Sequence, residues 1–149
     1  MNYSELVAAI EAYTENYEDS FVANIPVFVK QAEQRVYNTV QFPSLRKNAT
    51  SAMTLGNQYL PAPTDFLSVY SLAYVDPVTN AYEFLLNKDV NFIRQAYTNP
   101  STTGVPKYYA IFGPRSDAPT ELTFIVGPTP DKAYSVELHY YFYPQSIVD

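Results

Sequence analysis

The hydrophobic periodicity of the sequence changes between Phe42 and Pro43, and this change constrains the fold more than any other feature. Before it, apolar residues recur every three to four positions, as they do on one face of a helix. After it come eleven of the twelve prolines, which bracket short runs rich in β-branched and aromatic residues. Because proline ends helices and is excluded from central strands, these runs are predicted to be short strands joined by turns. Helices followed by a mostly antiparallel sheet predict an α+β fold.

Two amphipathic helices are predicted in the first 42 residues. Asn2 is a suitable N-cap for the first helix, because Glu5 follows three positions later in a capping-box relation. The second helix is predicted to start at Asn24 and Pro26 and to end before Pro43. Each helix carries an apolar stripe that needs a surface to cover it. The stripe residues are Leu6, Ala9, Ile10, Tyr13 and Tyr17 in the first helix, and Ile25, Phe28, Val29, Ala32, Val36 and Val40 in the second.

The rest of the chain is predicted to form strands with one short inserted helix. The predicted strands are 46–55, 66–76, 81–87, 107–113, 121–127 and 134–143. The helix is predicted over 88–97, with Asn87 as its cap. The last strand alternates most clearly, with Tyr134, Val136, Leu138, Tyr140 and Phe142 on one face and Ser135, Glu137, His139, Tyr141 and Tyr143 on the other. We therefore predict a single domain over 1–149, with a helix pair in 1–42 packed against a β-rich body in 43–149.

The composition predicts that another chain covers part of the surface. Only 16% of the 149 residues are charged, against about 25% in an average soluble domain. Tyrosine, with 15 residues, makes up much of the shortfall in charged residues. Tyrosine is enriched where a protein surface meets a partner. Tyr108, Tyr141 and Tyr143 are the candidate partner-facing aromatics.

Charge and composition also exclude several classes of protein. No apolar run approaches the roughly 18 residues of a membrane-spanning helix, so we expect no membrane association. The N-terminal segment carries acids where a signal peptide carries bases. The net charge is −6 with no basic stripe, which disfavours tight nucleic-acid binding by one chain. There are no cysteines, so disulfides and thiolate metal sites are excluded.

No group of residues predicts a catalytic, cofactor or metal site. His139 is the only histidine, and without a nucleophile or further ligands it makes neither a triad nor a typical zinc site. Glu11 and Glu15 lie one turn apart, but a solvated acidic face explains them more simply than a glycosidase pair. The four glycines are too widely spaced for a phosphate-binding loop. Two alternatives stay open: a carbohydrate-binding β-sandwich module, and a less favoured cell-wall glycosidase that uses Glu11 and Glu15.

The chain resembles the head-to-tail adaptor proteins of short-tailed bacteriophages, which are also called connectors or tail accessory factors. Two short segments are the most distinctive: Pro-Ala-Pro-Thr-Asp-Phe at 61–66, and the Gly-Pro-Thr-Pro-Asp turn at 127–131, directly before the last strand. The likeness extends over nearly the whole chain, in the segments 4–50, 59–74, 84–97, 106–113 and 122–144.

The resemblance implies a non-enzymatic structural protein of the virion, located at the head–tail junction and made in the host cytoplasm. Such proteins form a homo-oligomeric ring, dodecameric in this family, beneath the portal protein. The ring extends the DNA channel and docks the tail nozzle or next tail component. DNA is expected to pass without sequence-specific binding, in agreement with the acidic balance of the chain. Family members usually continue past the final strand into a helical segment that reaches the portal, whereas this sequence ends at Asp149.

A ring of identical subunits needs two different contact patches on each subunit. Charges of opposite sign along the first part of the chain are the candidates for these patches. The predicted subunit-interface residues are the acids Glu11, Glu15 and Glu18 and the bases Lys30, Arg35 and Arg46. We expect Arg35 or Arg46 to pair with an acid of the neighbouring subunit.

Overall fold

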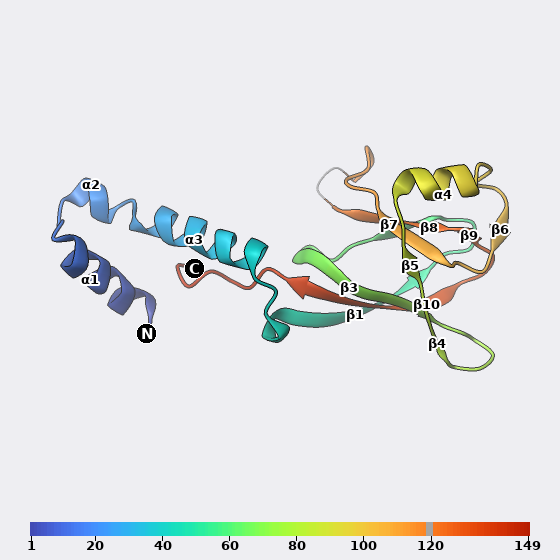
Figure 1. The fold of residues 1–149 in the computed structure, drawn as a ribbon, viewed down its shortest axis with the longest axis horizontal. Coiled ribbons are helices and arrows are strands. Elements are labelled where there is room, and N and C mark those ends of the chain that lie inside the picture. The colour runs from blue at the N-terminus through green and yellow to red at the C-terminus, as the bar shows by residue number, and fades with distance from the viewer. Residues whose placement is uncertain (119–120) are drawn as a thin grey trace. The chain divides into compact units, whose positions relative to one another are not determined.

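The computed structural model describes residues 1–118 and 121–149. It confirms the α+β fold: helices come first, antiparallel sheets follow, and one short helix is inserted between strands (Figure 1). The chain divides into two compact units. The helical unit contains Met1–Leu45 and Tyr143–Asp149, and the β unit contains Arg46–Phe142. That 1–149 forms a single domain stays a prediction. None of the helices in the described ranges is long and apolar enough to cross a membrane.

The helical unit contains α1 (Tyr3–Thr14), α2 (Asp19–Val22) and α3 (Ile25–Thr39), followed by a 3₁₀ turn at Pro43–Leu45. The predicted capping box is confirmed, because Asn2 Oδ1 accepts the Glu5 N–H at 2.9 Å and the Glu5 carboxylate accepts the Asn2 N–H at 3.0 Å. α1 ends where Glu15 adopts a left-handed backbone conformation, so Tyr17 lies beyond it. The predicted start of the second helix at Asn24 is confirmed, whereas the short α2 was not predicted.

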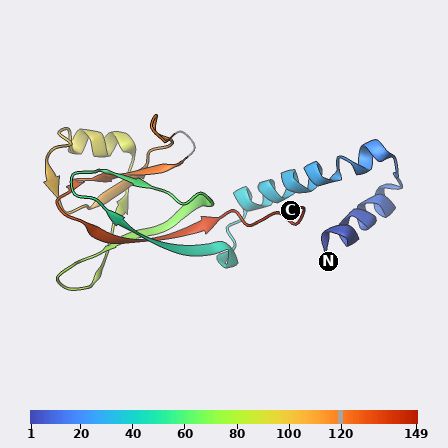
Figure 2. The same ribbon diagram turned by 180° about the vertical axis from the view of Figure 1, so that it is seen from behind.

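The C-terminal segment of the helical unit runs back along α3. Glu33 binds the middle of this segment, because its carboxylate accepts hydrogen bonds from the Ser146 hydroxyl at 2.6 Å and from the Ile147 N–H at 3.0 Å. Lys30 pairs with the Asp149 side chain at 2.5 Å, and the Tyr143 hydroxyl donates to Asn38 Oδ1 at 2.6 Å. Both ribbon views show the C-terminus beside α3 (Figures 1 and 2). These contacts fix the segment although it has no regular secondary structure.

The β unit is a two-sheet sandwich. Sheet 1 has the strand order β1-β10-β3-β4 and is antiparallel throughout, and sheet 2 has the order β2-β8-β7-β5 with β5 parallel to β7. The strands of sheet 1 are β1 (Arg46–Met53), β3 (Phe66–Val75), β4 (Tyr82–Phe84) and β10 (Tyr134–Phe142). Those of sheet 2 are β2 (Tyr59–Pro61), β5 (Leu86–Asn87), β7 (Tyr108–Ile111) and β8 (Thr123–Gly127). A small parallel pair is formed by β6 (Thr103–Gly104) and β9 (Thr129–Pro130).

The main core lies between the two sheets, and α4 (Val90–Ala96) covers the other face of sheet 2. The predicted inner face of β10 is confirmed, because Tyr134, Val136, Leu138 and Tyr140 are buried and Phe142 is partly buried. α4 packs Ile93 against Ala110 and Ile125, and Figure 1 shows the helix beside the strands of sheet 2. The β unit therefore has three layers, and the outer face of sheet 1 carries the exposed rings of Tyr70, Tyr82 and Phe84.

Three sequence-based expectations need correction. The N-cap of α4 is Asp89 and not Asn87, because Asp89 Oδ1 accepts the Asn91 N–H at 2.7 Å. The predicted strand at 81–87 is two strands in different sheets, because the chain turns inward at the buried Leu85. Tyr141 was expected to face a partner and shares a face of β10 with the exposed Ser135 and His139, yet it is only 5% exposed because Arg46 and Tyr70 pack over it.

Candidate functional site

His139 and Glu137 lie side by side on the outer face of sheet 1, but their geometry does not suggest catalysis. The contacts of the Glu137 carboxylate are with side chains of other strands of sheet 1. Asn48 donates to the Glu137 carboxylate at 2.6 Å. The same carboxylate accepts a hydrogen bond from the Tyr82 hydroxyl and thereby raises the pKa of Tyr82. Glu137 is therefore engaged in structural polar contacts across the sheet.

The acidic residues of the first helix lie at the surface of the helical unit. Glu11 is half-buried, whereas Glu15 and Glu18 are exposed. Glu15 occupies the C-cap of α1 and Glu18 the N-cap of α2, so the three acids do not share one helix face. Among residues 1–118 and 121–149, no three His, Cys, Asp or Glu side chains gather in a way that would hold a metal ion.

The three candidate interface bases differ in how strongly the chain itself uses them. Arg35 is exposed on α3. Lys30 is already paired with Asp149, although its side chain remains 47% exposed. Arg46 lies over the Tyr70 ring at 4.3 Å from its centroid, and its Nε donates to the Tyr141 hydroxyl at 3.2 Å. Both of these contacts are with uncharged tyrosine side chains, which do not neutralise the positive charge of Arg46. Whether any of the three faces a neighbouring subunit stays a prediction.

The three partner-facing tyrosines also differ in what they expose. Tyr143 is 39% exposed, and Tyr108 is half-buried against the Phe92 ring at 5.4 Å. Tyr141 presents little of its side chain to any partner, because it is buried beneath Arg46 and Tyr70. Tyr143 is thus the most accessible of the three, and their contact with a partner stays a prediction.

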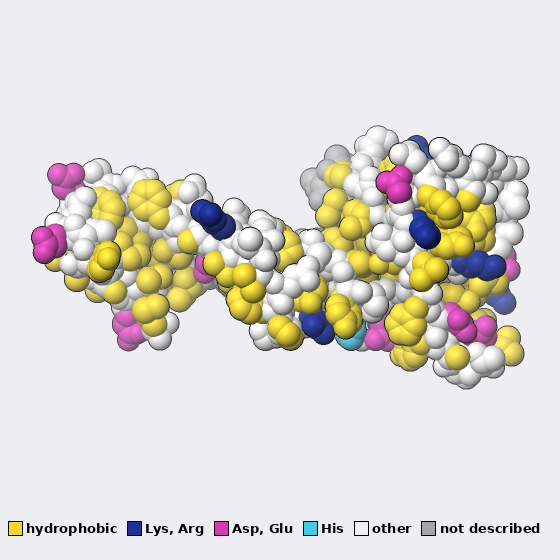
Figure 3. Space-filling view, in the orientation of Figure 1, with side chains coloured by type: hydrophobic (Ala, Val, Ile, Leu, Met, Phe, Trp, Pro, Cys, Tyr) yellow, Lys and Arg dark blue, Asp and Glu magenta, His cyan; other side chains and the backbone are white. Residues whose placement is uncertain are grey.

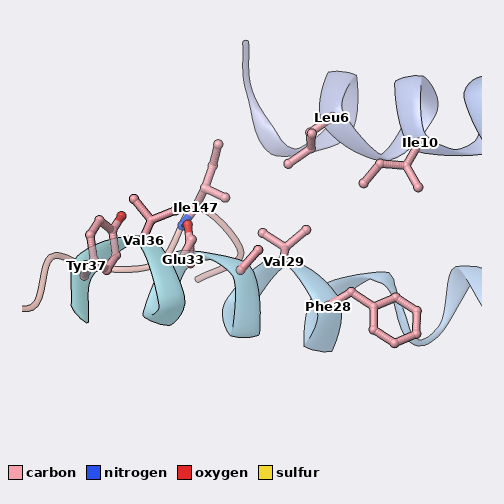
Figure 4. Close-up of a pocket in the computed structure, with 9 residues that line it drawn as sticks. Leu6, Ile10, Phe28, Val29, Glu33, Val36, Tyr37 and Ile147 are labelled. Atoms are coloured by element: carbon pink, nitrogen blue, oxygen red, sulfur yellow. The ribbon is translucent and has the colours of Figure 1, made fainter. Parts of the chain in front are cut away.

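An apolar groove runs through the helical unit, and we call it the helical groove. Its volume is about 480 Å³. Leu6 and Ile10 of α1 point across it toward Val29 of α3 (Figure 4). The sequence predicted that these stripes need cover, but it gave no sign that Ile147 would join them. The lining residues are Leu6, Ile10, Phe28, Val29, Ala32, Glu33, Val36, Tyr37 and Ile147.

A second groove lies at one open edge of the sandwich, and we call it the edge groove. Its volume is about 350 Å³, and it opens between β1 and the segment that begins with β2. The core residues Leu60, Val136 and Leu138 line it, although each is at most 6% exposed. Sequence reasoning missed this site because strands from distant parts of the chain form it.

The opposite edge of the sandwich carries exposed apolar side chains. They lie on the β3–β4 hairpin and on β5, which begins two residues after β4. Val78 at the hairpin turn is 82% exposed and Phe84 is 67% exposed, while Tyr82 and Leu86 are also exposed. Figure 3 shows hydrophobic side chains gathered on this part of the β unit. Such patches mark surfaces that bind other chains.

The described residues thus carry several uncovered apolar surfaces of the kind that contact other chains. The family model of the SU10 adaptor protein matches residues 1–149, and the chain belongs to this family of bacteriophage structural adaptors. The match confirms the resemblance to head-to-tail adaptors and indicates a virion component of the head–tail junction that interacts with portal and tail components. No curated protein matches the chain.

Proposed function

We propose that this adaptor closes into a ring, twelve copies in number, beneath the portal protein of a DNA-filled capsid. The ring extends the DNA channel and offers its lower face to the tail nozzle or next tail component. The family match is the main support for this proposal, because it extends over residues 1–149 and so includes both units rather than a single short motif. The exposed apolar surfaces of both units support it, since subunit contacts in a ring cover such surfaces.

The charge distribution supports two further parts of the proposal. The net charge of −6 lets the channel wall repel DNA, which then passes without sequence-specific binding. The exposed Arg35 and the still-charged Arg46 are free to meet Glu11, Glu15 or Glu18 of a neighbouring copy. Such pairs favour one orientation of the neighbour over others, more than they add affinity.

The deciding measurement is the mass of the species that the protein forms with and without its cognate portal. Native mass spectrometry of the mixture is expected to give the portal ring plus one full ring of adaptor copies. The portal of an unrelated phage serves as the control and is expected to bind none. A chain that stays monomeric with the cognate portal would contradict the proposal. Retention of that monomer on glycan resin would instead favour the carbohydrate-binding module.

A further inference from the structure

Sheet 1 has two free edges at opposite sides of the sandwich. Among the residues that the structure describes, β1 pairs only with β10, and β4 pairs only with β3. The outward backbone groups of an edge strand are available to a strand from another chain. β1 contributes eight residues to such an edge, which is longer than the usual strand of about five to six residues.

The β1 edge lacks the features that normally prevent strand addition. The strand contains no proline, and its only charges are at its first two residues, Arg46 and Lys47. The neighbouring edge of sheet 2 differs, because β2 ends in Pro61, which has no N–H to donate. Natural proteins protect long edge strands with charges, prolines or bulges along their length. The unprotected part of β1 therefore indicates an edge that is covered in the assembled state.

The two edges are complementary in shape. Beside β1 lies the edge groove, and the buried core residues Leu60, Val136 and Leu138 form part of its lining. Beside β4 lies the hairpin, which exposes Val78 at its turn, whereas the Phe84 ring lies on the outer face of sheet 1 and not on the core side where the edge groove opens. One edge is therefore hollow and apolar, and the other edge protrudes and is apolar.

Strand direction and charge are complementary as well. Neighbouring strands of sheet 1 all run antiparallel, so β1 and β4 of one chain run in opposite directions. If β4 of one copy lies beside β1 of the next, the sheet continues as an antiparallel sheet. β1 carries two bases and no acid, and the hairpin over 75–84 carries Asp76 and Glu83 and no base. Both bases lie at the start of β1, and Lys47 is paired internally with Asp65 at 2.7 Å.

We propose that the β4 edge of one copy adds to the β1 edge of the next copy, so that sheet 1 continues from subunit to subunit and the hairpin covers the edge groove. The contact is heterologous, because it joins two different edges, and it is therefore the type of contact that closes a ring. This inference rests on the proposed ring and specifies how the β units join within it.

Disulfide cross-linking provides the test, because the chain has no native cysteine. Thr50, Glu137, Ala73 and Phe84 form one row across sheet 1, so Thr50 and Phe84 of one chain lie at opposite edges. Two strands separate them, which places their Cα atoms about 14 Å apart, beyond the roughly 7 Å that a disulfide spans. In the double variant Thr50→Cys with Phe84→Cys, a disulfide therefore forms between copies and not within one.

The experiment compares oxidised double variants in the portal-bound ring. Asn48→Cys and Ala52→Cys replace Thr50→Cys in turn to scan the register, since they lie on the same face of β1. Tyr82→Cys replaces Phe84→Cys if that variant does not fold. We expect one combination to give a ladder of covalent multimers on a denaturing gel. The matched control pairs Thr50→Cys with Ser116→Cys, an exposed residue outside the hairpin, and is expected to give no ladder.

The outcomes separate this inference from the proposed function. A ring of the expected mass without any cross-linked ladder overturns the sheet contact and leaves the ring intact. A chain that never assembles overturns both. A covalent dimer from Thr50→Cys alone also overturns the inference, because it would place two β1 edges together.

A second variant tests the edge without cysteine chemistry. Ser51→Lys places a charge at the edge groove, which is how natural edge strands resist addition. We expect it to raise the concentration needed for assembly at least tenfold. Ser135→Lys is the matched control, because Ser135 is exposed on β10 in the interior of the same sheet. Equal assembly of the two variants would contradict the proposal.

Discussion

Buried tyrosines in this protein place their hydroxyls against carboxylates. The Tyr140 hydroxyl donates to Asp65 at 2.8 Å, and the Tyr134 hydroxyl donates to Asp131 at 2.6 Å. Burial, together with the hydrogen bond to Asp65, raises the pKa of Tyr140 to about 12. Partial burial opposes ionisation of Asp65, but hydrogen bonds from Lys47 and Tyr140 outweigh it and lower the pKa of Asp65. The many tyrosines of this chain thus fall into two groups. Buried tyrosines stabilise the fold, and exposed tyrosines are available to partners.

Tyr140→Phe tests, at alkaline pH, how a buried tyrosine stabilises the fold. The pKa of Tyr140 rises from about 10 in the unfolded chain to about 12, so its contribution to stability is complete below pH 10 and is lost as pH rises toward 12. We expect the variant to be about 1–3 kcal/mol less stable at pH 8, because Asp65 loses a donor. We also expect its stability to fall less steeply between pH 10 and 12. Urea unfolding at pH 8 and at several values between pH 10 and 12 measures both effects. Tyr13→Phe, at an exposed tyrosine, is the control. Parallel pH profiles would contradict it.

At the scale of elements, the contact between α4 and sheet 2 depends on a glycine. A Cβ at Gly127 would lie 2.8 Å from Ile93 Cγ2 and 2.8 Å from Tyr97 Cδ2, both in or next to α4. Ile93 is buried, with 1% of its surface exposed. The absence of a side chain at the end of β8 therefore lets α4 approach the sheet closely.

Gly127→Ala is accordingly expected to destabilise the protein by about 1–3 kcal/mol through overpacking. The urea midpoint, followed by circular dichroism, measures the change. Ser135→Ala, at an exposed strand position, is the control and should shift stability by less than about 0.5 kcal/mol. A Gly127→Ala midpoint equal to that of the control would show that α4 yields to the added methyl group.

The elements that the sequence predicted best are those specified by local signals. The capping box at Asn2 and Glu5 and the alternation along β10 needed no knowledge of distant residues. The short β2, β6 and β9 depend on partners far along the chain, so no local pattern indicated them. The choice of Asp89 over Asn87 as a cap also lay outside sequence reasoning, because both residue types cap helices and the backbone path decides. The edge groove needs β1, β2 and β10 together.

At the scale of the whole molecule, the low charge and high tyrosine content predicted uncovered apolar surface but did not locate it. The helical groove lies where two predicted stripes face each other, and Ile147 from the C-terminal segment completes it. The exposed hairpin and the edge groove lie at opposite edges of the β unit. Of the predicted aromatics, Tyr141 is used internally. Each unit thus contributes its own apolar surface to an assembly.

Charge reversal tests whether opposite charges order the subunits of the ring. The double variant Arg35→Glu with Arg46→Glu is expected to weaken ring assembly at low salt at least tenfold, because it places acids against Glu11, Glu15 or Glu18 of the neighbour. High salt should reduce the difference, since exposed charges are screened within about 8 Å at physiological ionic strength.

Because Arg46 also stacks on Tyr70, Arg35→Glu alone separates the charge effect from lost packing. Reversing Glu11 and Glu15 to Lys in the same chain should restore assembly. Lys132→Glu, in the β unit, is the control for Arg35→Glu alone, because each of these single variants changes the net charge by −2. Sedimentation of the portal-bound species at two salt concentrations measures each variant, and unchanged rings in the double variant would show that apolar contacts alone set the arrangement.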